Sequence, residues 1–278
     1  TMILQRALWA ALMLGLFLVS VLFERLHWLV TVLAIVFGAL CLVEIGKLIR
    51  ARSLRFPYPL CFVFALLLVA DGQVAGLSDG LHILTGFVVV ALTYRVLRSD
   101  YKNLAAEVGA NLLATAYIGL PMAMAVAMMQ MVDEAGSPIG KYHLLFQVLV
   151  VFTGDSAAYF VGRSWGKRPF FPRLSPMKKA EGAAASVIVS VAVALVLIIV
   201  FGPIRQFYGV GHGLLLGLLL GAAAPLGDLA ESAFKRDAGQ KDSASYLKGH
   251  GGFLDVFDAV LFGLPVQFCY IQLVLAQP

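Results

Sequence analysis

A short C-terminal segment of the 278-residue chain concentrates side chains that suit phosphate and metal chemistry. Asp255 and Asp258 are three residues apart at the start of an apolar run, so they share one face if that run is helical. Asp228 follows Gly227 at the end of the preceding apolar run. Carboxylates from two helix ends, completed by phosphate oxygens, suit Mg²⁺, which favours a compact octahedral shell of oxygen ligands. The segment 227–258 is therefore a candidate metal and phosphate site.

Basic side chains and one histidine lie among these carboxylates: Lys235, Arg236, Lys241, Lys248 and His250. Lys and Arg would neutralise phosphate charge that a metal ion leaves uncompensated. The Gly249–Gly252 turn would let backbone N–H groups approach an anion closely. The residues alone leave a second interpretation open, a solvated loop with ordinary ion pairs, for example between Glu231 and Lys235 at i, i+4.

The composition indicates that membrane-spanning elements position these groups. Hydrophobic residues make up 60% of the chain and charged residues only 13%, with a mean hydropathy of +0.89. A soluble domain typically has about 25% charged residues, so we expect an integral membrane protein and exclude a disordered chain or a collagen-like repeat. Cys41, Cys61 and Cys269 each stand alone in an apolar run, which argues against a disulfide framework and a zinc site.

Nine apolar runs approach the length of about 20 residues that crosses a bilayer as a helix. They are 8–23, 28–48, 58–76, 80–98, 106–131, 143–162, 183–202, 210–227 and 257–276. If the N-terminus is cytoplasmic, all but three of the 21 Lys and Arg residues face the cytoplasm, the exceptions being Arg25, Lys141 and Arg205. The positive-inside rule predicts this orientation, with the C-terminus outside.

We expect an N-terminal transmembrane region, 1–141, and a catalytic transmembrane region, 142–278, with cytoplasmic loops 163–182 and 228–255. These loops mix both charge signs with Gly and Ser, whereas a loop that only anchors topology needs Lys or Arg alone. Asp155, which apolar residues precede and follow, is predicted to be a buried charge. Close helix packing is predicted by a stripe of small residues on the eighth run: Gly213, Gly217 and Gly221.

The order of the polar residues is more specific than their composition. The C-terminal fragments are Ser232-Ala-Phe-Lys235-Arg236, Lys241-Asp242 and His250-Gly-Gly-Phe-Leu-Asp255-x-x-Asp258. The upstream fragments are Gly154-Asp155-Ser156, Gly162-Arg163, Gly166-Lys167 and Ser175-Pro-Met-Lys-Lys-Ala-Glu-Gly182. Together they resemble the signature of the phosphatidate cytidylyltransferases, also called CDP-diacylglycerol synthases. The resemblance is close over 154–182 and 225–265, and elsewhere extends only to a generic hydrophobic bundle.

The resemblance implies a multi-span, all-α enzyme of about nine transmembrane helices with a cytoplasm-facing polar cavity, in the bacterial inner membrane. Such enzymes make CDP-diacylglycerol and pyrophosphate from CTP and phosphatidic acid, as a step of phospholipid biosynthesis. The implied cofactor is Mg²⁺, and a second metal ion and a homodimer stay open. The implied partners are CTP, phosphatidic acid and membrane lipids, without nucleic acid.

The resemblance also implies roles for individual residues. Asp228 and Asp255 would bind the metal. The residues expected to take part in catalysis are Lys235, Lys241, Asp242, His250 and Asp258. The residues expected to bind nucleotide and phosphate are Asp155, Arg163, Lys178, Glu181, Ser232 and Arg236.

Several positions depart from the family pattern. Val256 stands where the family has Arg between the two final aspartates, and Lys248 stands where it has Pro, Gly or Ser. The 175–182 loop also differs, at Met177, Lys179 and Ala180. Loss of the Arg removes a planar phosphate clamp that Lys only partly imitates. The alternative is therefore a divergent paralogue that acts on another lipid acceptor, or a non-catalytic lipid-binding protein.

Overall fold

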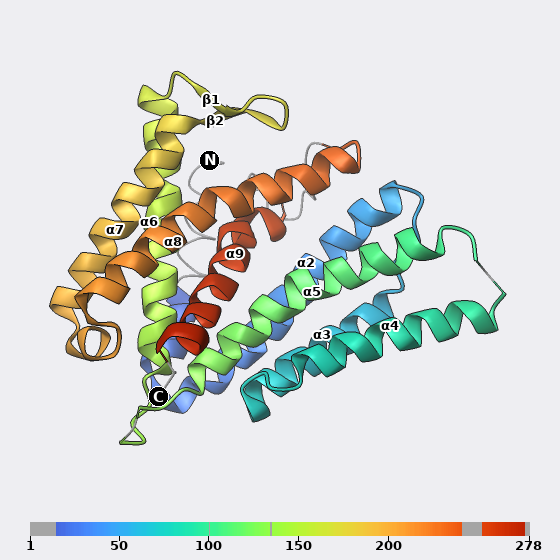
Figure 1. Cartoon of the computed structure of the whole chain (residues 1–278), viewed down its shortest axis with the longest axis horizontal. Coiled ribbons are helices and arrows are strands. Elements are labelled where there is room, and N and C mark those ends of the chain that lie inside the picture. The colour runs from blue at the N-terminus through green and yellow to red at the C-terminus, as the bar shows by residue number, and fades with distance from the viewer. Residues whose placement is uncertain (1–14, 100, 134, 241–251, 276–278) are drawn as a thin grey trace. The chain divides into compact units, whose positions relative to one another are not determined.

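The computed structural model describes residues 15–99, 101–133, 135–240 and 252–275 (Figure 1). The chain forms two compact units. Unit 1 comprises Thr1–Gln130 with Phe234–Val256, and unit 2 comprises Met131–Ala233 with Phe257–Pro278. The described residues are almost entirely helical apart from one two-stranded hairpin, which confirms the expected all-helical membrane fold.

Eight helical segments among the described residues are long and apolar enough to cross a membrane. The helices are α2 (Trp28–Ala51), α3 (Tyr58–Ala75), α4 (Gly80–Leu97), α5 (Leu104–Met129), α6 (Gly140–Trp165), α7 (Ala180–Val200), α8 (Gly202–Asp237) and α9 (Leu254–Tyr270). A 3₁₀ turn, η1 (Glu24–Leu26), precedes α2, and a π-helical turn, η2 (Ile271–Leu275), extends α9. They match the last eight predicted runs. The first predicted run, 8–23, lies partly outside the described residues, and its described part is helical over 15–22.

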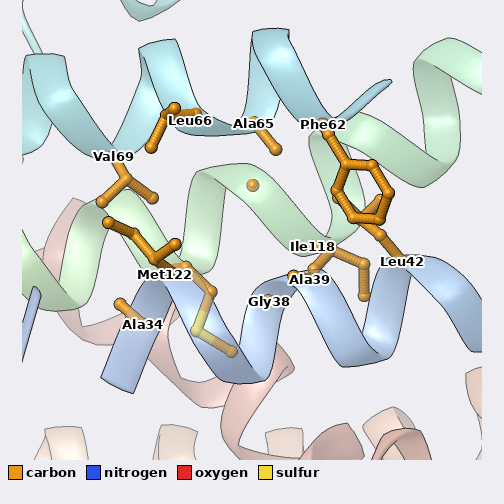
Figure 2. A pocket seen from close by; sticks show the side chains of 12 residues that line it. Ala34, Gly38, Ala39, Leu42, Phe62, Ala65, Leu66, Val69, Ile118 and Met122 are labelled. Atoms are coloured by element: carbon orange, nitrogen blue, oxygen red, sulfur yellow. The ribbon is translucent and has the colours of Figure 1, made fainter. Parts of the chain in front are cut away.

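In unit 1, the helices α2, α3 and α5 pack closely because small residues lie at their contacts. A Cβ on Gly119 of α5 would lie 3.3 Å from the Cα of Ala65 on α3. Between these three helices is an apolar cavity of about 140 Å³, and Figure 2 shows the side chains around it. Its walls include Gly38, Leu42 and Met122 and carry no charged residue. This cavity therefore offers no group for phosphate chemistry.

One buried ion pair joins α4 to α5 in unit 1. Arg95 and Glu107 are in direct contact, and both side chains are almost fully buried. The second guanidinium nitrogen of Arg95 donates to the carbonyl oxygen of Lys102 at 2.7 Å. Because a charge inside a transmembrane bundle is costly without partners, this pair holds the α4–α5 connection in one arrangement.

In unit 2, α6 and α7 lie side by side (Figure 1), joined by a hairpin of β1 (Pro169–Phe171) and β2 (Ser175–Lys179). The hydroxyl of Ser190 on α7 donates to the carbonyl of Val150 on α6 at 3.1 Å. The neighbouring hydroxyl of Ser186 donates to the carbonyl of Gly221 on α8 at 3.0 Å. These bonds connect three spans through small polar side chains.

The small-residue stripe on α8 brings that helix against α7, as predicted. A Cβ on Gly217 would lie 2.7 Å from the Cβ of Ala194, and one on Gly221 would lie 2.8 Å from the Cβ of Ser190. Both distances are too short for real Cβ contacts, so only glycine permits this approach of the two helices.

Helix α8 differs from its predicted span at both ends. At its start, Gly209 has a positive φ of 64°, which separates a short helical segment from the long one that follows. At its end the helix continues to Asp237, so the first part of the expected 228–255 loop is helical. Ala, Glu, Lys and Arg favour helix, and their abundance over 230–236 explains the extension.

Candidate functional site

Three carboxylates gather in unit 2. Asp228 and Glu231 are three residues apart on α8, and Asp258 is on α9. One ligand oxygen from each lies within 4.8 Å of the other two. Glu231 and Asp258 are only 1% and 6% exposed, while Asp228 is half-buried. Ionised carboxylates at this separation repel one another, so nearby positive charge would stabilise the arrangement.

Gly227 accounts for the closeness of the two helices at this cluster. A Cβ at this position would lie 2.5 Å from the carbonyl oxygen of Asp258 and 3.1 Å from the Cβ of Phe262. Any larger residue would force α8 away from the first turns of α9. The residue that immediately precedes Asp228 thus determines whether the carboxylates of α8 can meet that of α9.

Lys178 supplies positive charge from the hairpin. Its Nζ lies 2.5 Å from a carboxylate oxygen of Asp228 and 3.3 Å from the hydroxyl of Ser232. The structure thus brings together three residues for which the family resemblance implies a role, two from α8 and one from β2. A cation held on a hairpin, beside a metal-type carboxylate set, suits contact with a phosphate group.

Glu181 fixes the base of that hairpin. Its carboxylate, in the first turn of α7, accepts hydrogen bonds from the backbone N–H groups of Lys167 at 3.1 Å and Arg168 at 3.2 Å. The strand pairing places Phe171 opposite Ser175 and Pro169 opposite Lys179. The role of Glu181 visible in the structure is therefore to position the strand that carries Lys178.

The remaining predicted residues of α6 are placed differently. Asp155 keeps an accessible surface, although neighbouring protein atoms remove much of its carboxylate from water, so its prediction as a buried charge is met in part. It lies within electrostatic range of Asp228 and Lys178, so it contributes to the charge of the same region. Arg163, one residue beyond Gly162, donates from its guanidinium to the hydroxyl of Tyr159 at 2.9 Å. Local sequence polarity could not reveal which face of α6 Asp155 occupies.

Unit 1 holds the other predicted metal ligand, Asp255. One of its oxygens lies 2.7 Å from Nζ of Lys235, and the other accepts the N–H of Gly252 at 2.6 Å. Asp255 therefore caps the start of α9 and pairs with a predicted catalytic lysine. Its pairing with Asp228 on one metal ion stays a prediction. Arg236 hydrogen-bonds the carbonyl of Gln240 at 3.4 Å.

Three other predicted catalytic residues lie outside the described part of the chain. They are Lys241, Asp242 and His250.

Glu44 is a positioning residue that the motif comparison did not reveal. Its side chain on α2 is fully buried and accepts the N–H of Phe253 at 2.8 Å and that of Leu254 at 2.9 Å. The first N–H groups of a helix lack partners within the helix and attract negative charge. Glu44 thus caps α9 at the turn that carries Asp255. The sequence signal was a lone acid within an apolar span, although nothing in the sequence named its partner.

An oxygen-only donor set at the carboxylate cluster fits a hard divalent cation. Asp228, Glu231 and Asp258 each offer a carboxylate oxygen, and no sulfur or imidazole ligand belongs to the described group. Mg²⁺ is commonly bound by one or two carboxylates together with substrate phosphates. The residues present therefore suit Mg²⁺ better than a softer metal such as Zn²⁺, which favours Cys and His.

Comparison with known proteins agrees with this chemistry. The sequence pattern of the cytidylyltransferase family matches residues 4–274. The chain is 33% identical to the phosphatidate cytidylyltransferase of Bacillus subtilis over 276 residues, which cover 98% of this chain and 97% of that protein. It is 31% identical over 232 residues to the enzyme of that name from Staphylococcus epidermidis, covering 82% of this chain and 85% of that protein. An uncharacterised Escherichia coli protein, YnbB, is 34% identical over 190 residues, covering 68% and 61%. The chain thus belongs to the cytidylyltransferase family.

Proposed function

We propose that the protein transfers the cytidylyl group of CTP to phosphatidic acid, giving CDP-diacylglycerol and pyrophosphate in a Mg²⁺-dependent reaction of phospholipid biosynthesis. Family membership and the near full-length likeness to the Bacillus subtilis enzyme support the reaction. The structural observation that carries the proposal is the meeting of Asp228, Glu231 and Asp258 beside Lys178. Carboxylates can hold a metal ion, and a lysine can offset phosphate charge, which are two tasks of metal-assisted phosphate transfer.

The reaction needs alignment and charge compensation more than proton transfer. A phosphate oxygen of phosphatidic acid attacks the α-phosphorus of CTP in line, and a new P–O bond forms. The bond from the α-phosphorus to the oxygen that bridges it to the β-phosphorus breaks, and pyrophosphate leaves with that electron pair. The attacking oxygen is already anionic, so no strong general base is needed. Mg²⁺, when bound, would polarise phosphate oxygens and offset their charge.

The protein groups have separate tasks in this proposal. Asp228, Glu231 and Asp258 hold the cation, and Lys178 contacts phosphate oxygens where charge develops. Lys235 and Lys241 are the proposed contacts of the leaving pyrophosphate. Asp255, which the family resemblance assigns as a metal ligand, orients Lys235 through their ion pair.

We also propose that the N-terminus and the polar loops face the cytoplasm of a bacterial inner membrane. The basis is the one-sided distribution of Lys and Arg along the sequence. That orientation places the carboxylate cluster where soluble CTP and a membrane-embedded acid can both arrive. Reporter fusions after Arg98 and after Arg205 test this orientation. The fusion after Arg98 should report the cytoplasm, and the fusion after Arg205 should report the opposite side of the membrane.

A divergent acceptor or loss of catalysis is the second candidate, favoured by Val256 between Asp255 and Asp258. Purified protein with Mg²⁺, phosphatidic acid and CTP labelled at the α-phosphate separates the two. Labelled CDP-lipid supports the proposed transfer. A parallel reaction with CTP labelled at the γ-phosphate detects a kinase, which would label the lipid there and leave it unlabelled with α-labelled CTP. Binding of phosphatidic acid without turnover, with turnover gained in Val256→Arg, would favour a non-catalytic paralogue and overturn the proposal.

A further inference from the structure

The hairpin between α6 and α7 has a composition that its role in positioning Lys178 does not explain. Both flanking helices are long and apolar enough to span a membrane, and the hairpin connects their ends (Figure 1). A hairpin between two such spans would lie at a membrane surface. The segment 163–179 contains no acidic residue. Its six basic residues are Arg163, Lys167, Arg168, Arg173, Lys178 and Lys179. Such a one-signed segment beside a bilayer attracts anionic headgroups.

The two faces of strand β2 differ sharply. Successive side chains of a strand point to opposite faces, and Lys178 points toward Asp228 and Ser232. Its neighbour Met177 is 83% exposed. On strand β1, Phe171 is 45% exposed. The hairpin therefore places large apolar side chains on its surface while it directs a lysine to the carboxylate cluster.

A third exposed apolar residue, Trp165, lies where the hairpin leaves α6. Trp165, the last residue of α6, is 73% exposed. Trp at the end of a span is typical of the headgroup level of a bilayer, where one part of the ring is apolar and its N–H stays hydrated. Trp165, Phe171 and Met177 together are called the hairpin tip surface below.

We propose that the hairpin tip surface inserts into the headgroup region of an anionic phospholipid leaflet. The free energy falls when exposed apolar side chains on a segment outside the spans leave water. The surrounding Lys and Arg provide charge complementarity to acidic lipids. The hairpin backbone stays at the interface, because its unpaired groups would be too costly in the hydrocarbon core.

This insertion gives the hairpin two coupled roles. The tip surface contacts the leaflet, and the adjacent Lys178 on the same strand contacts Asp228. The second role, which rests on the proposed function, is to align the phosphate of a lipid acceptor with the carboxylate cluster. The first role, insertion, does not depend on activity and is measured separately.

Insertion is tested with an environment-sensitive fluorophore on a single cysteine. Met177→Cys is made in a Cys269→Ser background, because Cys41 and Cys61 are buried and Cys269 is exposed. The labelled protein is reconstituted into vesicles that contain phosphatidylglycerol. We expect blue-shifted emission, loss of most fluorescence to a nitroxide placed near the lipid headgroup, and little quenching by aqueous iodide.

Gln240→Cys is the control, since this neutral residue is exposed and lies outside the hairpin. It should show the opposite pattern, quenched by iodide more than by nitroxide lipid. Iodide quenching at position 177 equal to that at 240 would place the tip surface in water and overturn the proposal. Protection of position 177 from both quenchers would mean that protein covers it, for example a second copy, and would also overturn it.

A kinetic experiment tests the second role. Phe171→Ser with Met177→Ser should raise the apparent KM for phosphatidic acid in vesicles several-fold. The KM for CTP should be unchanged, as should activity in detergent micelles, where substrate diffuses with the detergent. Equal loss in vesicles and micelles would indicate a structural defect and contradict the alignment role. If the unaltered protein makes no CDP-lipid, the proposed function fails while the fluorescence result still decides insertion.

Discussion

At the scale of single residues, the carboxylate cluster sets the strongest requirement on function. Glu231 and Asp258 are buried, and each has a carboxylate oxygen within 4.8 Å of the other and of Asp228. Glu231 was predicted only as part of a charged segment, whereas the structure gives it a place equal to that of Asp228. A buried cluster of three acids beside one lysine suits a bound cation better than an ion-pair network.

Asp258→Asn should remove one negatively charged ligand with little change of volume. Substituting residues that only support metal ligands costs up to about 100-fold in activity. Because Asp258 would bind the metal directly, we expect cytidylyl transfer to fall by about 100-fold or more. Asp228→Asn should behave alike, and Asp79→Asn, on an exposed turn, is the control expected to keep full activity. Initial rates with α-labelled CTP measure this. Near-normal turnover in both cluster variants would refute the metal-binding role.

Lys178→Met should weaken phosphate contact while it retains the aliphatic part of the side chain. Removing one donor that stabilises developing charge typically costs about 10²–10³-fold in rate. We expect a loss in kcat of that order, partly restored in Lys178→Arg. Lys167→Met, exposed on the same connection, serves as the control. The lysine role is wrong if Lys178→Met and Lys167→Met give equal rates.

At the scale of elements, two contacts place the first turns of α9. Glu44 of α2 caps the helix at Phe253 and Leu254, and Gly227 of α8 lets α8 reach the backbone of Asp258. Neither residue contributes a group that reacts. Each acts through the position of the helix that carries Asp255 and Asp258.

Gly227→Ala should separate α8 from α9, because the new Cβ would lie 2.5 Å from a backbone oxygen. Overpacking of this kind costs about 1–3 kcal/mol of stability, and the carboxylate cluster would widen. We expect a lower unfolding temperature in detergent. The apparent affinity for Mg²⁺ in the transfer reaction should also fall. Gly109→Ala is the matched control, since a Cβ there has no neighbour within 4 Å. Equal unfolding temperatures for the two variants would contradict this packing role.

Glu44→Ala should leave the first N–H groups of α9 without their carboxylate. Loss of a helix cap costs about 0.5–2 kcal/mol, so we expect a lower unfolding temperature and reduced kcat. Glu44→Gln, which keeps one acceptor oxygen, should fall between Glu44→Ala and the unaltered protein. Glu24→Gln, at an exposed position, is the control. Unchanged stability and kcat in Glu44→Ala would exclude the capping role.

At the scale of the whole molecule, cation binding should be visible without turnover. A ligand that binds only the folded state stabilises it. Mg²⁺ should therefore raise the unfolding temperature of the protein, and chelation with EDTA should reverse the effect and abolish transfer. Asp258→Asn should lose most of this Mg²⁺-induced shift. An identical shift in the variant would place the cation away from the cluster.

The span pattern of the molecule could be predicted because helix formation in a membrane depends on local sequence. Backbone groups in hydrocarbon must be satisfied within each segment, so long apolar runs become helices wherever they occur. The predicted runs from 28–48 onward agree with α2 to α9. The family could also be recognised, since the order of polar residues around 154–182 and 225–265 is a linear feature.

Partner choice among the polar residues could not be predicted in the same way. The sequence suggested that Asp228 and Asp255 bind one metal ion, which stays a prediction. It did not indicate that Asp228 would meet Glu231 and Asp258, or that Asp255 would pair with Lys235. The cytoplasm-facing polar cavity likewise stays a prediction. Contacts between residues far apart in the chain depend on how closely helices approach.

The sequence by itself determined that this protein spans a membrane with many helices, which family it belongs to and which segments carry its chemistry. Only the tertiary structure decided which acids share one cluster, that Lys178 reaches it from a hairpin, and that Glu44 caps α9. The physical reason is that hydropathy and motif order act along the chain. The meeting of charges depends instead on side-chain volume at helix contacts such as Gly227, which the linear order does not reveal.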